Sequence, residues 1–511
     1  MEPSVRKPLL DQEPADYQTV REQQMARETE KAYYGTLKNG RLLCAVLAAV
    51  LGNFNFGFAL VYPSPVIPAL EKTSIPSLKL TEQSGSWFGS VFSIGVAIGG
   101  LGTMYFNDRL GRKRSIMFSA LPSAIGYLLM ASAQEVWMLL VGRILTGFAG
   151  GVTSASIPVY VSEISHPLIR GALGSCPQIM AVLGSLSLYA LGLILPWRWL
   201  AVAGEVPVLA MVIILCFMPY SPRFLISKGK EDDAISALIW LRGKDVDYWW
   251  EYEQIKATVN QQGQSISWAD IKDPYIYKPV LIAVMMRLLQ QLSGVTPVIV
   301  YLQLIFESTA VILPAQYDAV LVGVARLASV AIAAFSMDKA GRKILLYVSA
   351  SIMLASSLTM GLYITFTREQ FHNSTALLGN GDHVSLASTP SGLKIIPLLA
   401  IVIYIIGYAV GWGPITWLLM SEVLPLKTRG VVSGLCVLAS WVTAFATTKA
   451  FPIVKVAFGL EVPFYFFSVI CVVNLIFTRW IPETRGKSLE RIESYFRTGR
   501  KSFLESFRRH E

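Results

Sequence analysis

The chain has 511 residues, of which 53% are hydrophobic and only 15% are charged. Soluble domains carry about 25% charged residues, so this composition excludes an ordinary soluble protein and indicates a membrane protein. The net charge is +10, but the basic residues lie in short links and tails between apolar segments, a pattern that orients membrane helices. We therefore expect a lipid bilayer and no nucleic acid as partner. The five cysteines lie in apolar segments without a Cys-x-x-Cys pair, and we expect no metal site and no cofactor.

Twelve apolar segments are long enough to cross a bilayer, whose hydrocarbon core of about 30 Å needs about 20 helical residues. The expected helices cover residues 42–63, 86–106, 115–133, 137–160, 171–194, 199–218, 279–301, 318–337, 344–366, 395–419, 431–452 and 462–481. The fold class is therefore an all-α membrane protein with six helices in each half of the chain.

A polar linker separates the two halves. It contains two periodic stretches, 231–242 and 248–259, that predict short surface helices. The expected divisions are a tail at 1–40, a six-helix half at 41–218, the helical linker at 219–278, a second six-helix half at 279–481 and a tail at 482–511.

Two polar motifs occur once in each half. The pattern Asp-x-x-Gly-Arg-Lys stands at 108–113 and again at 338–343. Ser-Glu is followed by Arg-Gly at the same spacing in 162–171 and in 421–430. Matching order and spacing in a charge-poor sequence indicate a duplication, with both halves in the same topology.

The basic loops at 109–114 and 339–343 fall on one side of the membrane if both termini are cytosolic. The sequon at Asn373 then lies in the loop between the ninth and tenth helices, on the lumenal side where glycosylation occurs. Leu9 and Leu10 in the N-terminal tail are either a sorting signal for an adaptor partner or a leucine pair without meaning.

Charged residues of the paired motifs lie at the expected cytosolic helix ends. They are either topology signals alone or ion pairs that lock the halves together and break during a conformational change. The residues concerned are Arg112, Glu163, Arg170, Asp338, Arg342, Glu422 and Arg429.

Polar side chains inside apolar helices are costly unless they form hydrogen bonds. Gln290 and Gln291 are adjacent amides in the seventh helix, and they bond either other helices or a polyhydroxylated ligand. The fifth helix offers Gln178, and the tenth offers Trp417 after glycines and a proline that should break the helix. Amides that bond hydroxyls and an aromatic ring that stacks on a sugar face are typical of sugar binding.

Two arginines lie within apolar segments. For Arg143 we expect a structural ion pair near the cytosolic end of the fourth helix. Arg326 has no acid near it in its own helix, so its partner comes from another helix or from the ligand.

These motifs resemble the sugar-porter branch of the major facilitator superfamily, specifically the class III facilitative hexose transporters. The resemblance rests on 108–113, 163–170, 290–294, 413–417, 422–429 and 482–486, and it covers nearly the whole chain. It implies the major facilitator fold, a monomer, and a lysosomal or other intracellular membrane. The family's loop motifs place Arg223, whose motif has lost its acid in this chain, and Glu483 in the charged network.

The resemblance also assigns substrate-binding positions to Gln178, Gln290, Gln291 and Trp417. Thr296 and Arg326 stand where the family has asparagine, so several hydroxyl partners are absent. An acid that proton-coupled relatives carry in the first helix is missing from 56–59. The expected function is uniport of a hexose, with glucose the first candidate. The alternatives are transport of an anionic or other non-hexose metabolite using Arg326, or a sugar sensor without transport; we expect no enzyme.

Overall fold

The computed structural model describes residues 35, 37–243, 248–261, 274–309, 311–378, 392–424, 429–484 and 496. The predicted sorting residues Leu9 and Leu10 lie outside this part of the chain. The side chains of Asn373, Asp338, Glu422 and Arg429 also lie outside it, and their predicted roles stay predictions.

The first half is a bundle of long helices. Its elements are α2 (Gly40–Val61), α3 (Pro63–Glu71), α4 (Glu82–Arg109), α5 (Arg112–Phe118), α6 (Ala120–Ala131), α7 (Val136–Ile164), α8 (Pro167–Leu191) and α9 (Trp197–Cys216). The linker carries α10 (Pro222–Ser227), α11 (Glu231–Arg242) and α12 (Tyr248–Gln261), so both predicted linker helices are present.

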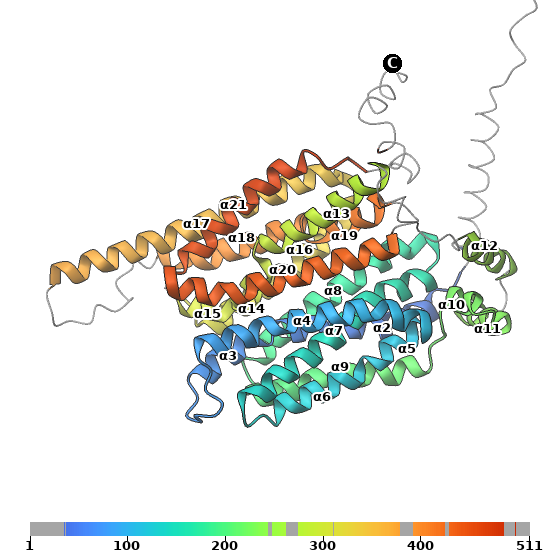
Figure 1. Cartoon of the computed structure of the whole chain (residues 1–511), viewed down its shortest axis with the longest axis horizontal. Coiled ribbons are helices and arrows are strands. Elements are labelled where there is room, and N and C mark those ends of the chain that lie inside the picture. Colours follow the sequence, from blue (N-terminus) through green and yellow to red (C-terminus); the bar gives the residue numbers. More distant parts are fainter. Residues whose placement is uncertain are drawn as a thin grey trace, which may run out of the picture.

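The second half repeats the plan with more interruptions. Its elements are α13 (Pro274–Leu292), α14 (Val295–Val300), α15 (Leu302–Glu307), α16 (Ala315–Ala340), α17 (Arg342–Leu378), a 3-10 turn (Leu393–Ile395), α18 (Ile396–Val410), α19 (Pro414–Val423), α20 (Arg429–Phe458) and α21 (Glu461–Thr478). Twelve spans in the described chain are long and apolar enough to cross a membrane, which agrees with the predicted number. Figure 1 shows the two bundles lying side by side with their long helices running along the same direction.

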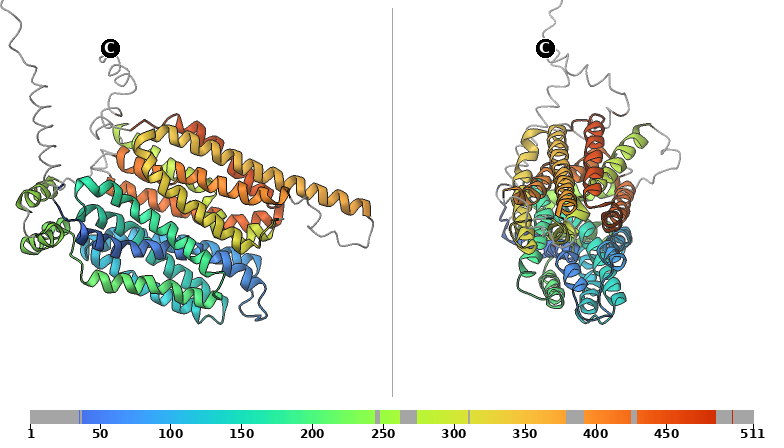
Figure 2. Two further views of the ribbon diagram at one scale, coloured as in Figure 1. Left: turned by 180° about the vertical axis from the view of Figure 1, so that it is seen from behind. Right: turned by 90° about the vertical axis from the view of Figure 1, so that its left-hand side faces the viewer.

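One boundary differs from the prediction in a way that matters. The ninth predicted helix was to end at 366, but α17 continues to Leu378 and projects beyond the bundle (Figure 2). The first glycine after 366 is Gly379, and helix formation continues up to it. Asn373 therefore lies on a helix and not in the predicted loop.

Glycines let helices of the first half pack backbone against backbone. A Cβ on Gly99 would lie 2.2 Å from the carbonyl oxygen of Phe148, and one on Gly147 would lie 2.3 Å from that of Phe92. Glycine spaced by four residues on both α4 and α7 gives the close contact that small residues allow inside membranes. The same device joins α2 and α8, where Gly184 meets the carbonyl of Phe54.

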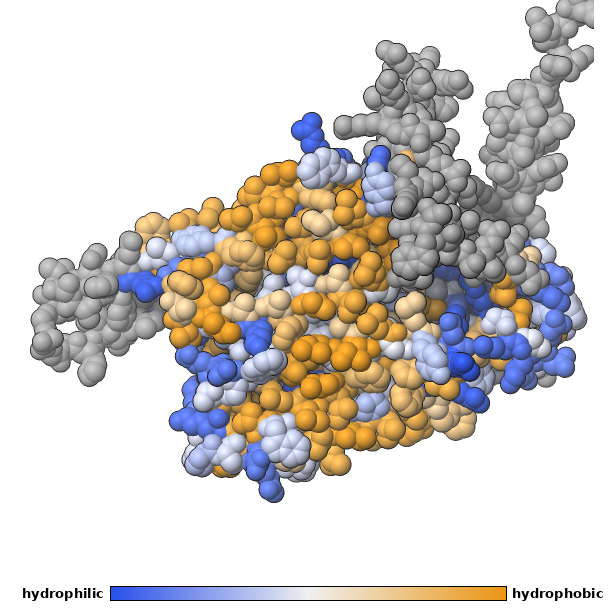
Figure 3. All heavy atoms as spheres, viewed as in Figure 1, coloured by the Kyte–Doolittle hydropathy of each residue, from blue (hydrophilic) through white to orange (hydrophobic). Residues whose placement is uncertain are grey.

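The two ends of the molecule differ. We call the end that carries Gly111 and Gly341 the motif end; both glycines have positive φ, +82° and +89°, and turn the chain into α5 and α17. The linker helices lie at this end (Figure 1), where Arg242 pairs with Glu251 at 2.7 Å and donates to the Ile164 carbonyl. We call the other end, which carries α3 and α15, the distal end. Between the ends an apolar surface covers the bundle (Figure 3), as expected for contact with lipid.

Candidate functional site

Two helices of the second half are broken where the sequence placed its polar residues. The break between α18 and α19 at Gly411–Gly413 was predicted from glycine and proline. A second break, between α13 and α14, was not predicted: Gly294 has φ +92°, and a Cβ there would collide with the ring of Phe467. Broken helices expose backbone groups that other side chains must satisfy.

Gln290 donates hydrogen bonds to the backbone carbonyls at the break in the tenth helix. Its Nε2 donates to the carbonyl oxygens of Trp412 (2.8 Å) and Gly413 (3.1 Å) and to the hydroxyl of Tyr408 (3.0 Å). Its Oε1 accepts from Arg287. The sequence left open whether this amide bonds other helices or a ligand. The structure shows hydrogen bonds to other helices.

Gln291 is held in a similar way. Its Nε2 donates to Ser440 Oγ at 3.1 Å, and its Oε1 accepts from the hydroxyl of Thr296 at 2.7 Å. Thr296 lies at the start of α14, so this pair of bonds ties the break in the seventh helix to α20. Both side chains are buried.

Arg287 is a buried charge that the sequence analysis missed. Its side chain is 1% exposed, and its guanidinium lies 3.7 Å from the ring centroid of Trp417. The ring of Trp417 is itself 40% exposed, so Arg287 stacks on the indole without covering all of it. An arginine within the apolar segment 279–301 was visible in the sequence by the same argument that singled out Arg326.

Arg326 lies in the middle of α16 and carries an unpartnered nitrogen. Its Nη1 is buried without a hydrogen bond. The ionisable neighbours that interact with its charge are the phenols of Tyr189 and Tyr408, with no carboxylate among them in the described chain. Gln178 on α8 is half-buried, and its side chain makes no hydrogen bond to another described residue.

At the motif end, the predicted charges pair within a half. Arg112 binds Glu163 at 3.0 Å, and Glu163 also accepts from Ser221. In the second half the carboxylate of Glu483 accepts from the backbone amides of Arg342 (3.1 Å) and Lys343 (3.0 Å) and caps α17. Each of these contacts joins elements of one half. The locking of the two halves stays a prediction, because the side chains of Asp338, Glu422 and Arg429 lie outside the described residues.

Two other predicted charges lack ion pairs in the described chain. Arg170 donates to the Ser165 carbonyl at 3.0 Å. Arg223 lies at the start of α10, half-buried and without a described acid as partner.

The prediction for Arg143 was wrong in both position and partner. The residue lies seven positions after the start of α7, at Val136, and so nearer the distal end than the motif end. It is fully buried, donates to the carbonyl oxygens of Ala59 and Phe88, and lies 4.5 Å from the ring centroid of Phe92. Backbone dipoles and aromatic faces replace the expected carboxylate.

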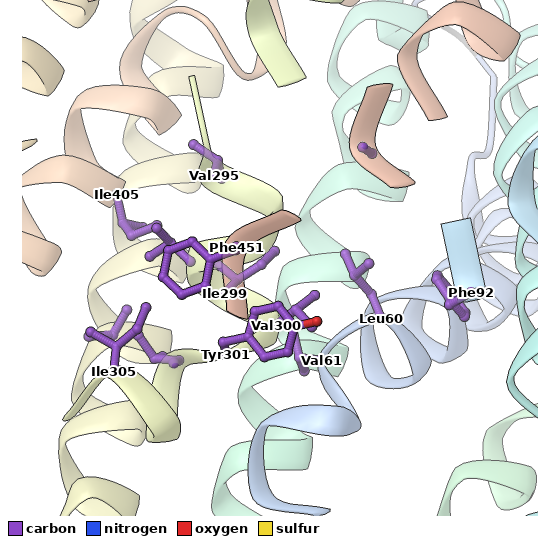
Figure 4. Close-up of a cluster of buried hydrophobic side chains, with 14 of the residues drawn as sticks. Leu60, Val61, Phe92, Val295, Ile299, Val300, Tyr301, Ile305, Ile405 and Phe451 are labelled. Atoms are coloured by element: carbon purple, nitrogen blue, oxygen red, sulfur yellow. The ribbon is translucent and has the colours of Figure 1, made fainter. Parts of the chain in front are cut away.

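The two halves pack along α4 and α20, and the hydrogen bonds and ion pairs between their described residues gather at the distal end. Tyr189 donates to the Ile299 carbonyl at 2.8 Å, the backbone N–H of Gln303 donates to Ser64 Oγ at 3.3 Å, and Lys72 pairs with Glu307 at 3.3 Å. The Tyr301 hydroxyl donates across the halves to the Ser86 carbonyl at 3.5 Å, and its ring stacks on Phe451 of its own half with centroids 5.7 Å apart. Figure 4 shows the Tyr301 ring beside Val61 of the first half. We call these contacts the distal seal.

Comparison with known proteins agrees with this architecture. Residues 44–496 match the family model for "Sugar (and other) transporter". The chain is 61% identical over 506 residues to the human solute carrier family 2, facilitated glucose transporter member 6, covering 98% of this chain and 100% of that protein. It is 40% identical over 469 residues to the mouse facilitated glucose transporter member 8, covering 90% and 95%.

Among solved structures, the xylose transporter XylE from E. coli, in a partially occluded inward open conformation, matches with a TM-score of 0.72 at 23% identity, covering 88% of this chain and 99% of that one. This likeness shows the major facilitator fold of two six-helix halves. By its sequence and its fold, the chain is a multi-pass membrane protein that belongs to the sugar (and other) transporter family.

Proposed function

We propose that the protein is a facilitative hexose transporter that works by alternating access, with glucose as the first substrate to test. The observation that carries the proposal is the distal seal, in which hydrogen bonds and an ion pair join described residues of the two halves at one end of the molecule. Such contacts form and break as two halves rock about a site between them. The relatives named as facilitated glucose transporters support the substrate class.

The proposed site lies between the broken helices of the second half and α8 of the first half. Trp417 offers an exposed indole face for the sugar ring, and Gln178 offers an amide that no described residue engages. Gln290, Gln291 and Thr296 hold the breaks in shape around it.

Transport without proton coupling is the second part of the proposal. The ionisable neighbours of Arg143 are the tyrosines 62, 127 and 301, with no described carboxylate beside it. Glu205, a half-buried carboxylate of α9 whose Oε2 accepts from Ser123 at 3.2 Å, is the acid whose removal tests for proton coupling. A uniporter does not need it to titrate.

The orientation and membrane belong to the same proposal. We place both termini in the cytosol because the basic residues gather at the motif end, and we favour a lysosomal or other intracellular membrane. Protease protection of epitope tags at either terminus in sealed vesicles tests the orientation.

Hexose counterflow in proteoliposomes tests the transport function. Vesicles preloaded with glucose should take up labelled glucose without a proton gradient, and Glu205→Gln should do so at the wild-type rate. Uphill accumulation driven by a pH gradient, lost in Glu205→Gln, would contradict uniport. Binding of glucose without any exchange would favour a sensor.

A further inference from the structure

We propose that the substrate site contains an anion-binding subsite, formed by Arg326 and Tyr408, so that the preferred ligand is a monosaccharide carrying a carboxylate or a phosphate. The inference rests on the proposed sugar site beside Trp417 and names the class of ligand for it.

Arg326 is placed where an unpaired charge is most costly. It follows the start of α16 by 11 residues, or about 16 Å of helix at 1.5 Å per residue, and its Nη1 is buried without a partner. Taking a charge out of water without a counter-charge is unfavourable. The tyrosine phenols near it are neutral, and no described carboxylate compensates it.

Tyr408 supplies a second donor beside this arginine. Its hydroxyl oxygen accepts from Gln290 Nε2 at 3.0 Å, and the described residues offer no acceptor for its own proton. The hydroxyl can therefore donate to a ligand. Its helix, α18, packs on α16, and its phenol interacts with the charges of both Arg326 and Arg287. The hydroxyl of Tyr189, in contrast, already donates its hydrogen bond to the Ile299 carbonyl.

Arg287 adds a second positive charge to the region around Tyr408, beside that of Arg326. Its charge neighbours are Tyr408 and Cys436, again without a described carboxylate, and its Nε is buried and unpartnered. Because its Nη1 is engaged by Gln290 and Thr416, Arg287 positions the amide and the indole and adds to the positive potential.

The buried guanidinium of Arg287, the half-buried Arg326 with its buried Nη1, the free phenolic proton of Tyr408 and the exposed indole of Trp417 suit one kind of ligand. The ring of a sugar stacks on Trp417, and an anionic substituent reaches Arg326 and Tyr408 through charge-assisted hydrogen bonds. A neutral hexose leaves the Arg326 charge uncompensated. Carboxylate and phosphate share this chemistry, and they differ in shape and charge.

Equilibrium binding to the purified full-length protein separates the possibilities. The probes are radiolabelled D-glucuronate, D-glucose 6-phosphate and D-glucose, with wild type, Arg326→Gln, Arg326→Lys and the control Lys79→Gln. Lys79 is exposed on the loop before α4, so its replacement removes one positive charge away from the site. Size-exclusion profiles confirm that each variant is folded.

The expected result is that wild type binds one of the two anionic sugars about tenfold or more tightly than glucose, as one charge-assisted contact allows. Arg326→Gln should lose this preference, Arg326→Lys should keep part of it, and Lys79→Gln should behave as wild type. The better of glucuronate and glucose 6-phosphate identifies the anionic group.

Equal binding of all three sugars, an unchanged preference in Arg326→Gln, or no binding of either anion overturns the subsite. Counterflow distinguishes this outcome from failure of the proposed function. Glucose exchange without anion preference removes only the subsite, whereas anion binding without exchange of any sugar supports the subsite and removes the transport function. A current on a glucuronate concentration jump, absent with glucose, is expected if the anion crosses alone.

Discussion

At the scale of single residues, the site shows how buried polar groups are divided between architecture and ligand. Both polar atoms of the Gln290 side chain form hydrogen bonds, with the exposed carbonyls of a broken helix and with neighbouring side chains. Gln178 and Arg326 keep polar atoms that the described protein does not use. Residues of the second kind are the better candidates for contact with substrate, because their unused donors gain most from a ligand.

This division gives a prediction for the two glutamines. Gln290→Ala removes the amide that donates to the carbonyls of Trp412 and Gly413, of which Gly413 keeps the Thr416 hydroxyl as a donor. It should therefore lower the free energy of unfolding by about 1–3 kcal/mol as well as reduce exchange. Gln178→Ala should weaken sugar binding and leave stability unchanged. Thermal denaturation of the purified variants, beside counterflow, checks both. Equal stability of the two variants would contradict the capping role of Gln290.

Helix N-termini at the motif end give a second residue-scale prediction. Glu483→Gln removes the carboxylate that accepts from the amides of Arg342 and Lys343, and should cost about 0.5–2 kcal/mol, the range for loss of a cap. Hydrogen exchange of the first turn of α17 should rise. The start of α5, which lacks this cap, is the internal control; a rise of equal size in both places would argue against a local effect.

At the scale of elements, helix contacts depend on glycines that face a neighbouring backbone. Gly184→Val would drive a side chain into the Phe54 carbonyl, since even a Cβ would lie 1.9 Å from it. Forced separation of α2 and α8 should cost about 1–3 kcal/mol or more. Gly174→Val, on the same helix but with open space around its Cβ, is the matched control. The melting temperatures of the two variants, each purified in detergent, measure the difference. Similar melting temperatures would refute the packing argument.

At the scale of the whole molecule, function depends on which end is closed. A side chain on Gly89 would meet the Tyr301 hydroxyl, 2.3 Å from the Cβ position, so Gly89→Leu should wedge the distal seal and favour the state open at that end. The reporter is Gly174→Cys, on the same helical face as Gln178 (i and i+4) with open space around it.

Labelling of this cysteine by a maleimide supplied from the motif end should slow when Gly89→Leu is added. Arg112→Gln, which breaks the pair with Glu163, should not restore it if that pair acts within its half. Faster labelling in the Gly89→Leu background would show that the seal does not control access.

The sequence by itself determined the twelve spans, the duplication, the linker helices and the break in the tenth helix. These follow from local properties: apolar length, repeated spacing, periodicity and the backbone limits of glycine and proline. Only the tertiary structure decided the partners of the polar groups. It gave Arg143 backbone carbonyls in place of an acid, turned Gln290 toward a broken helix, brought Arg287 onto Trp417, and paired Arg112 with Glu163 of the same half. The physical reason is that a buried polar group takes its partner from whichever helix packs beside it, and helices far apart in the sequence meet only when the bundle is assembled.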